Sequence, residues 1–138
     1  MLDKDRILAK IDELDAYLGE LKQIAPSRYD VYQQIEKKRS CERLLQLCIE
    51  CVIDVCKLVV VQLRLGLPSE ENDLFAKLEN RGVLSHQLAE VVRQMRGFRN
   101  ILIHEYAAVD DELVYTYVNT RLGDFESFKK EILTALHA

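Results

Sequence analysis

The sequence predicts an all-α protein, an antiparallel bundle of four long helices plus a short helix. Its 138 residues are 49% apolar and 30% charged, which suffices for both a packed interior and a solvated surface. Only five glycines and two prolines interrupt the chain, too few for the turns of a sandwich or barrel. Apolar residues recur at helical spacing. The length fits one domain, which we expect to span residues 1–138.

The first predicted helix runs from about Asp3 to Ile24. Asp3 is a suitable N-cap, and Pro26 ends the helix. Its apolar residues form one stripe at spacings of three and four: Ile7, Ile11, Leu14, Leu18 and Leu21. One face of this helix is therefore expected to pack against the rest of the bundle.

The second predicted helix is long, from Ser27 to about Gly66, because no Pro or Gly interrupts this stretch. Asp30 is expected to form a capping box with Ser27. Two apolar stripes line its second half: Leu44, Cys48, Cys51, Val55 and Leu58, and Leu45, Ile49, Val52, Cys56, Val59 and Leu63. Such a helix is central and covered on more than one side, and we expect a second subunit to supply part of the cover.

A short helix is predicted over about Ser69 to Asn80, between the break at Gly66 and Pro68 and the stop at Gly82. Its inward residues are expected to be Leu74, Phe75 and Leu78.

Two further helices complete the predicted bundle. Ser85 is expected to cap the next one, with its inward residues at helical spacing: Leu88, Val91, Val92, Met95, Phe98, Leu102 and Ile103. The last begins near Asp110 or Asp111, and Gly123 predicts a kink or split within it. Its inward candidates are Leu113, Tyr117, Leu122, Phe125, Phe128 and Ile132.

Charge and apolar content limit the classes of function. The formal net charge of −4 argues against binding nucleic acid by bulk charge, so any RNA contact needs a local basic patch. The N-terminal residues lack the apolar core of a signal peptide, and charged residues interrupt the apolar stretch from Leu44 to Leu65. We therefore expect a cytoplasmic protein that does not span a membrane.

Four cysteines fall within the second predicted helix: Cys41, Cys48, Cys51 and Cys56. Cys48 and Cys51 have CxxC spacing, but no second CxxC and no nearby His completes a zinc site. We interpret the cysteines as small core residues of a reduced protein. The alternative is a redox or metal role.

The stretch from Arg93 to Tyr106 holds the candidate functional residues. Arg93, Arg96 and Arg99 are three residues apart, so they lie on one side of a helix and form a local cationic patch. Asn100 and His104 share a face as well.

These residue types can cleave an RNA phosphodiester without a metal. An imidazole takes the proton from a ribose 2′-OH, or donates one to the leaving oxygen. A guanidinium stabilises the charge that grows on the phosphoryl oxygens. In this scheme Arg99 and His104 act on the RNA, Asn100 orients the imidazole, and Tyr106 donates a hydrogen bond or holds a phosphate.

Spacing alone also permits a structural interpretation. His104 could interact with the negative pole of a helix end, and Tyr106 could pack over the end of the bundle. Arg93 and Arg96 could be ordinary solvated charges.

The string GFRNILIHEY, residues 97–106, resembles the signature of HEPN domains. It matches their pattern of an Arg followed by a polar residue and, four to six residues after the Arg, a His. The narrower pattern of Arg, four residues, His, one residue and Tyr is similar to the HepT branch, in which Gly-Phe often precedes the Arg. Chain length, the long apolar second helix and the VDDELVY segment extend the resemblance over essentially the whole chain. Ile103 stands where Val is common, a conservative difference.

The resemblance implies a HEPN fold, a homodimer that joins two motifs in one cleft, and metal-independent endoribonuclease activity of a toxin. Arg99 and His104 take the catalytic positions and Asn100 supports them; Arg93 and Arg96 are RNA-binding candidates. It further implies a minimal nucleotidyltransferase antitoxin, similar to MntA, that transfers AMP to Tyr106 and blocks the site. ATP and Mg²⁺ would serve that partner, and this chain would need no cofactor.

Three hypotheses follow. The first is the ribonuclease toxin just described. The second is a non-catalytic HEPN module that binds nucleotide or RNA, or serves as partner of a nucleotidyltransferase, which the acidic composition favours. The third is a structural helical dimer whose motif packs the bundle.

Overall fold

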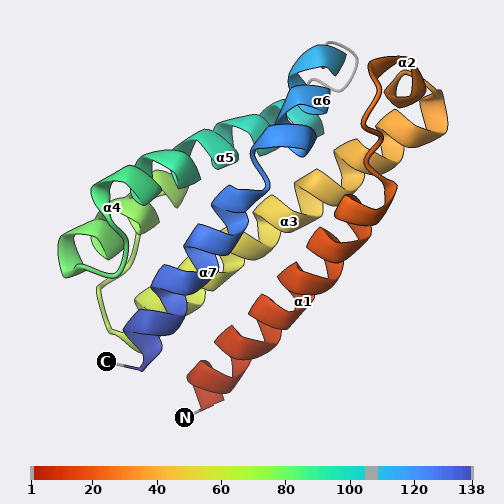
Figure 1. Cartoon of the computed structure of the whole chain (residues 1–138). Coiled ribbons are helices and arrows are strands. Elements are labelled where there is room, and N and C mark those ends of the chain that lie inside the picture. Colours follow the sequence, from red (N-terminus) through yellow and green to blue (C-terminus); the bar gives the residue numbers. More distant parts are fainter. Residues whose placement is uncertain (1, 105–108, 138) are drawn as a thin grey trace.

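The computed structural model describes residues 2–104 and 109–137, which form seven helices and no strand. The helices are α1 (Leu2–Ile24), α2 (Tyr29–Tyr32), α3 (Ile35–Gln62), α4 (Glu71–Arg81), α5 (His86–His104), α6 (Asp111–Thr120) and α7 (Gly123–Leu136). Figure 1 shows α1, α3, α5 and the α6–α7 pair running alternately up and down, with both termini near one end and α2 and α6 at the other. The predicted all-α antiparallel bundle is confirmed.

Helix α3 is the centre of the bundle, as its apolar circumference predicts. It contacts α1, α2, α4, α5 and α6. Its interior positions are almost completely buried, among them Leu45, Ile49, Val52 and Val59. The chain's own helices supply most of this cover, and Leu44 and Leu58 remain only partly buried. Further cover by a second subunit stays a prediction.

The prediction of one helix from Ser27 to Gly66 is wrong at its start. The backbone is extended at Gln34, which separates the single turn of α2 from α3. The separation lets Tyr32 turn inward, where it is fully buried against Tyr29 and Tyr115 of α6. Burial of a large aromatic side chain outweighs the helical propensity of the polar residues around the break.

The predicted capping box at Ser27 does not form. Arg28 takes the N-cap position of α2 without a side-chain cap. The Asp30 carboxylate instead accepts a hydrogen bond from the Arg28 guanidinium at 2.6 Å. The side chain of Asp is shorter than the usual Glu of this motif, and a nearby cation binds it here.

Three further helix ends agree with the sequence, whereas α1 begins at Leu2, before the predicted N-cap Asp3. Gly82 closes α4 in the left-handed conformation at φ +84°, which glycine adopts without strain. Ser85 Oγ accepts a hydrogen bond from the Leu88 amide at 3.1 Å, and the Asp110 carboxylate accepts one from the Leu113 amide at 3.2 Å. The split predicted at Gly123 is present, because α6 ends at Thr120.

Two predicted inward residues are wrong. The Leu113 side chain is 50% exposed, and Ile103 is 37% exposed. On α6 the buried residues are Val114 and Val118. The helix therefore packs on the core with the face that contains Val114, one residue after Leu113.

The four cysteines lie on α3 and are free and buried, which confirms their interpretation as core residues. Burial raises the pKa of Cys41 to about 11 and the pKa of Cys48 and Cys51 to about 12. These thiols therefore stay protonated at neutral pH. Among the described residues, no helix is both long and apolar enough to cross a membrane.

Candidate functional site

Helix α5 carries most of the motif and packs one face on the core. The buried face consists of Leu88, Ala89, Val92, Met95 and Leu102. This burial turns Arg93, Arg96 and Arg99 toward α4, whose Leu74, Phe75 and Leu78 are buried in the same core. We call the ion-paired residues between the two helices the α4–α5 seam; they are Glu71, Glu79, Arg93, Arg96 and Arg99.

Arg99 is held at two places on its guanidinium. Its Nη2 donates to Glu71 Oε1 at 2.5 Å, and its Nε donates to Asn100 Oδ1 at 3.0 Å. The Arg99 side chain is only 13% exposed. Arg99 is therefore the most enclosed of the three arginines, and its head group has a defined orientation.

Glu71 holds a second arginine as well. Arg96 Nε donates to the same oxygen, Glu71 Oε1, at 3.0 Å. Partial burial by itself raises the pKa of Glu71, but the hydrogen bonds and positive charges of Arg96 and Arg99 outweigh it and lower the pKa below its ordinary value. Glu71 is thus a stable carboxylate at neutral pH.

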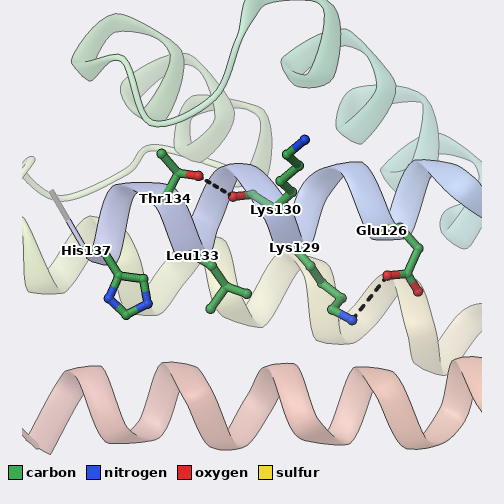
Figure 2. A pocket seen from close by; sticks show the side chains of 6 residues that line it. All are labelled: Glu126, Lys129, Lys130, Leu133, Thr134 and His137. Atoms are coloured by element: carbon green, nitrogen blue, oxygen red, sulfur yellow. Dashed lines mark hydrogen bonds and ion pairs between the residues drawn. The ribbon is translucent and has the colours of Figure 1, made fainter.

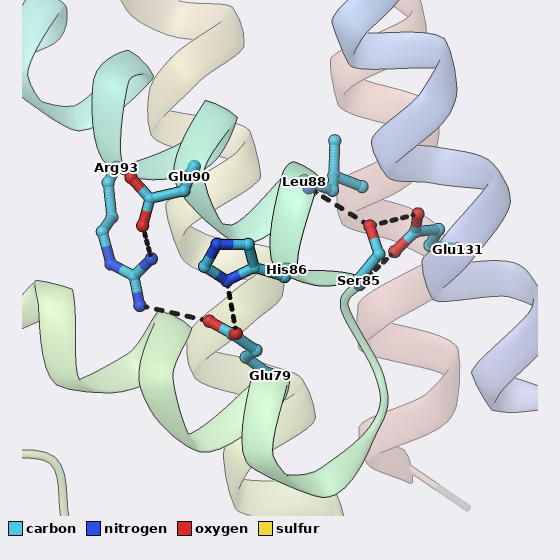
Figure 3. A network of polar contacts seen from close by, with 7 residues as sticks. All are labelled: Glu79, Ser85, His86, Leu88, Glu90, Arg93 and Glu131. Atoms are coloured by element: carbon cyan, nitrogen blue, oxygen red, sulfur yellow. Dashed lines mark hydrogen bonds and ion pairs between the residues drawn. The ribbon is translucent and has the colours of Figure 1, made fainter.

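The other end of the seam is a second charged network (Figure 3). Glu79 lies between His86, whose Nδ1 is 2.8 Å from Glu79 Oε2, and Arg93, whose Nη2 is 3.4 Å from Glu79 Oε1. Arg93 also pairs with Glu90 on its own helix. The hydrogen bond with His86 and the pairing with Arg93 lower the pKa of Glu79. On the other side of the helix start, Ser85 binds Glu131 of α7.

These contacts refine the predicted cationic patch. The three arginines lie on one side of α5, as their spacing predicts, but each already pairs with a carboxylate. The patch is therefore close to neutral within the described residues. The role of Arg93 and Arg96 in binding RNA stays a prediction.

The remaining motif residues lie at the end of α5. His104 is the last residue of the helix and is exposed. Asn100 was expected to orient this imidazole, but its carbonyl oxygen accepts from Arg99 instead, and no hydrogen bond joins His104 to Arg99 or Asn100 in the described part of the chain. Tyr106, the predicted AMPylation site, lies outside the described residues.

Arg99 and His104 can supply different parts of one reaction. The guanidinium is fixed and charged, which suits it to stabilise a phosphoryl group. The imidazole is accessible, which suits it to exchange protons with a bound substrate. A contact between the two is not needed for these roles, provided that one phosphate reaches both.

Sequence reasoning missed Glu71. It comes from a short helix 28 residues before Arg99, and it stands in a run of acidic residues that looks like a solvated helix start. Acidic residues are common in the first turn of a helix because they interact with its positive pole, so their presence there carries little information about a partner.

A surface hollow elsewhere contains none of the motif residues. It runs along α7 and is lined by Glu126, Lys129, Lys130, Leu133, Thr134 and His137 (Figure 2). The polar groups there bind one another, as in the ion pair of Lys129 with Glu126. Across residues 2–104 and 109–137, no cluster of His, Cys, Asp and Glu is placed to hold a metal ion.

The chain is similar to known proteins over most of its length. The family model described as Ribonuclease HepT-like matches residues 14–132, which include α5 and its motif. The chain is 28% identical to the mRNA nuclease HepT of Shewanella oneidensis, over 90% of this chain and 93% of that protein. It is 27% identical to the tRNA nuclease HepT of Aphanizomenon flos-aquae, over 91% of this chain and 86% of that protein.

A solved structure agrees with the fold as well. It is a tri-AMPylated HEPN toxin of Shewanella oneidensis in complex with an MNT antitoxin. The TM-score is 0.86 at 27% identity, and the match covers 93% of this chain and 96% of that one.

Proposed function

We propose, on the premise that this chain belongs to the Ribonuclease HepT-like family, that it is an endoribonuclease toxin whose Arg99 and His104 act on RNA. The observation that carries the proposal is the fixed, enclosed Arg99 guanidinium five residues before an exposed His104 in the family's motif. One relative is named for mRNA and the other for tRNA, so the proposal commits to RNA, the class common to both.

The reaction uses the ribose 2′-OH as nucleophile. Neutral His104 takes its proton, and the 2′ oxygen forms a bond to the adjacent phosphorus. The bond from phosphorus to the 5′ oxygen breaks, and the imidazolium returns a proton to that leaving oxygen. Arg99 stabilises the charge on the phosphoryl oxygens. The products are a cyclic phosphate and a 5′-OH, and DNA is spared because it lacks the nucleophile.

No step of this reaction requires a metal ion or a cofactor. Side chains supply the proton transfer and the positive charge. We expect Asn100 to support the site through its hydrogen bond with Arg99. Arg93 and Arg96 would contact the RNA backbone if phosphates displaced their carboxylate partners.

The proposal includes a partner that controls the site. A minimal nucleotidyltransferase antitoxin would bind this chain, as an MNT antitoxin does in the solved complex. The Tyr106 phenol oxygen would attack the α-phosphorus of ATP, and pyrophosphate would leave, with ATP and Mg²⁺ held by the partner. The added phosphate would compete with RNA for the arginine. We further propose a cytoplasmic homodimer in which residues 1–138 form one domain.

A second candidate function is a non-catalytic HEPN module that binds RNA or nucleotide, or serves the nucleotidyltransferase as partner. The pairing of all three arginines with carboxylates favours it, as does the net charge of −4. A site that is close to neutral attracts phosphates weakly.

The deciding experiment is RNA cleavage by the purified chain in EDTA, with intact mass measured to detect AMP adducts. His104→Ala should lower the rate by at least about 100-fold. His137→Ala is the matched control, because His137 is exposed, directly follows α7 and lies outside the motif. Cleavage that persists in His104→Ala contradicts the proposed mechanism. RNA binding without turnover by unmodified protein supports the second candidate.

A further inference from the structure

We propose that Glu71 of α4 is a positioning residue, which sets the orientation in which the Arg99 guanidinium meets the scissile phosphate. The inference rests on the proposed function and extends it to a second helix. It derives from the shared acceptor in the α4–α5 seam, where one carboxylate oxygen binds both Arg96 and Arg99.

The contacts fix the plane of the guanidinium. Asn100 accepts from Nε of Arg99 and Glu71 accepts from Nη2, so the group is held at two separate nitrogens. A planar group held at two points cannot rotate about its own bond to the side chain. These two bonds use two of about five N–H donors of an arginine, and a bidentate phosphate contact needs about two more.

The carboxylate itself is held firmly. Phe75, one helical turn after Glu71, is fully buried, and Leu74 and Leu78 are buried beside it. The Glu71 side chain is 25% exposed and the Arg99 side chain 13% exposed, so solvent screens this pair less than it screens a surface pair. The bundle core therefore fixes the place of Glu71, and Glu71 fixes Arg99.

A negative charge beside the phosphate site has two opposing effects. It repels RNA and so weakens ground-state binding. It also keeps the guanidinium in the orientation that the transition state needs, and misplacement by about 1 Å can cost about 100-fold in rate. Positioning thus predicts that loss of the carboxylate lowers kcat without raising KM, because removal of the charge favours RNA binding.

The test compares three variants with the wild type in steady-state RNA cleavage in EDTA. Glu71→Ala should lower kcat by about 100-fold. Glu71→Gln keeps an oxygen acceptor and should retain an intermediate kcat, with KM equal to or below that of the wild type. Glu70→Gln is the matched control, since Glu70 is the exposed preceding residue and makes no side-chain cap hydrogen bond. It should leave both constants unchanged.

Several results would overturn the inference. Unchanged or faster cleavage by both Glu71 variants would mean that the carboxylate is neutral or masks Arg99. A rise in KM with constant kcat would assign Glu71 to ground-state binding. Should Glu71→Ala fail to fold, the Glu71→Gln variant still gives the kcat and KM comparison.

An independent measurement separates this inference from the proposed function. An inactive wild-type chain would count against the nuclease, and solvent exchange of the Arg99 Nε hydrogen, followed by NMR, would then test the positioning. Glu71 binds Nη2 of the same planar group, so its loss should loosen the hydrogen bond from Nε to Asn100 as well. We therefore expect exchange to be faster in Glu71→Gln than in Glu70→Gln. Equal exchange in the two variants would show that Glu71 does not restrain Arg99.

Discussion

Helix α3 and the α4–α5 seam lie side by side and are stabilised by different forces. The inner positions of α3 are apolar and buried on several sides, and its four thiols stay protonated. The seam joins partly exposed carboxylates to arginines. Apolar burial contributes about 25 cal/mol per Å², whereas partly exposed ion pairs contribute about 1 kcal/mol or less. The core thus supplies most of the stability. The charged residues of the seam can serve a reaction with little effect on the free energy of unfolding.

The largest expected effect on stability is in α3. Ile49→Ala removes a fully buried side chain and should lower the free energy of unfolding by about 2–5 kcal/mol. Urea unfolding measures it. Ile49→Val keeps most of the volume and should cost about 0.5–1.5 kcal/mol. A loss below that of the valine variant would mean that α3 is less central than its burial indicates.

Whereas Ile49→Ala is expected to affect mainly stability, Arg99→Lys should cause a large loss of activity and a small loss of stability. Lysine lacks the planar fork and cannot bind Asn100 and Glu71 together. We expect kcat for RNA cleavage to fall by about 100-fold, equal to about 2.7 kcal/mol of barrier. The free energy of unfolding should change by about 1 kcal/mol or less. Arg43→Lys, at an exposed position of α3, serves as control; an active Arg99→Lys would argue against the proposed role.

Acid should weaken the seam before the core. The pKa of Glu71 is lowered in the folded protein and has its ordinary value in the unfolded chain. Between these two pKa values the unfolded chain therefore binds the proton more readily than the folded protein does. The stability that Glu71 contributes is present above the ordinary pKa of about 4.3 and is lost as pH falls through the lowered value. The free energy of unfolding of wild type minus Glu71→Gln should therefore shrink as pH falls below about 4.3. A constant difference across this range contradicts the pairing.

The smallest expected effect is at the other end of the seam. Arg93→Gln removes the half-exposed pairs with Glu79 and Glu90 and should change the free energy of unfolding by about 0.5 kcal/mol. The difference in melting temperature from the wild type should diminish at about 1 M salt, where screening acts within about 3 Å. A loss as large as that of Ile49→Ala would show that the seam contributes to the core.

Much of this architecture can be predicted from short sequence patterns. Ser85, Asp110 and Gly82 mark helix ends because each acts on backbone groups a few residues away. The alignment of three arginines on α5 likewise needs only the helical period. These features are predictable because their causes lie within a single helix.

The features that could not be predicted depend on distant contacts. The break at Gln34 lets Tyr32 bury its ring against Tyr115. The residues around Gln34 do not predict this contact, because Tyr115 is far away in the sequence. The pairing of Glu71 with Arg99 depends on how α4 docks on α5. The solvent-facing position of Leu113 depends on how α6 is rotated against the bundle. Each needs the packing of two helices before it can be inferred.

The brevity of α4 has a consequence for motion. With 11 residues it is shorter than the about 12–15 residues at which an isolated helix becomes marginally stable in water, so it exists as a helix because it is docked. Local opening of α4 would withdraw Glu71 from Arg99 while the rest of the bundle stays folded. Backbone amides of α4 should then exchange with deuterium sooner than those of α3. The fraction of molecules with an oriented guanidinium would equal the docked population of this one short helix.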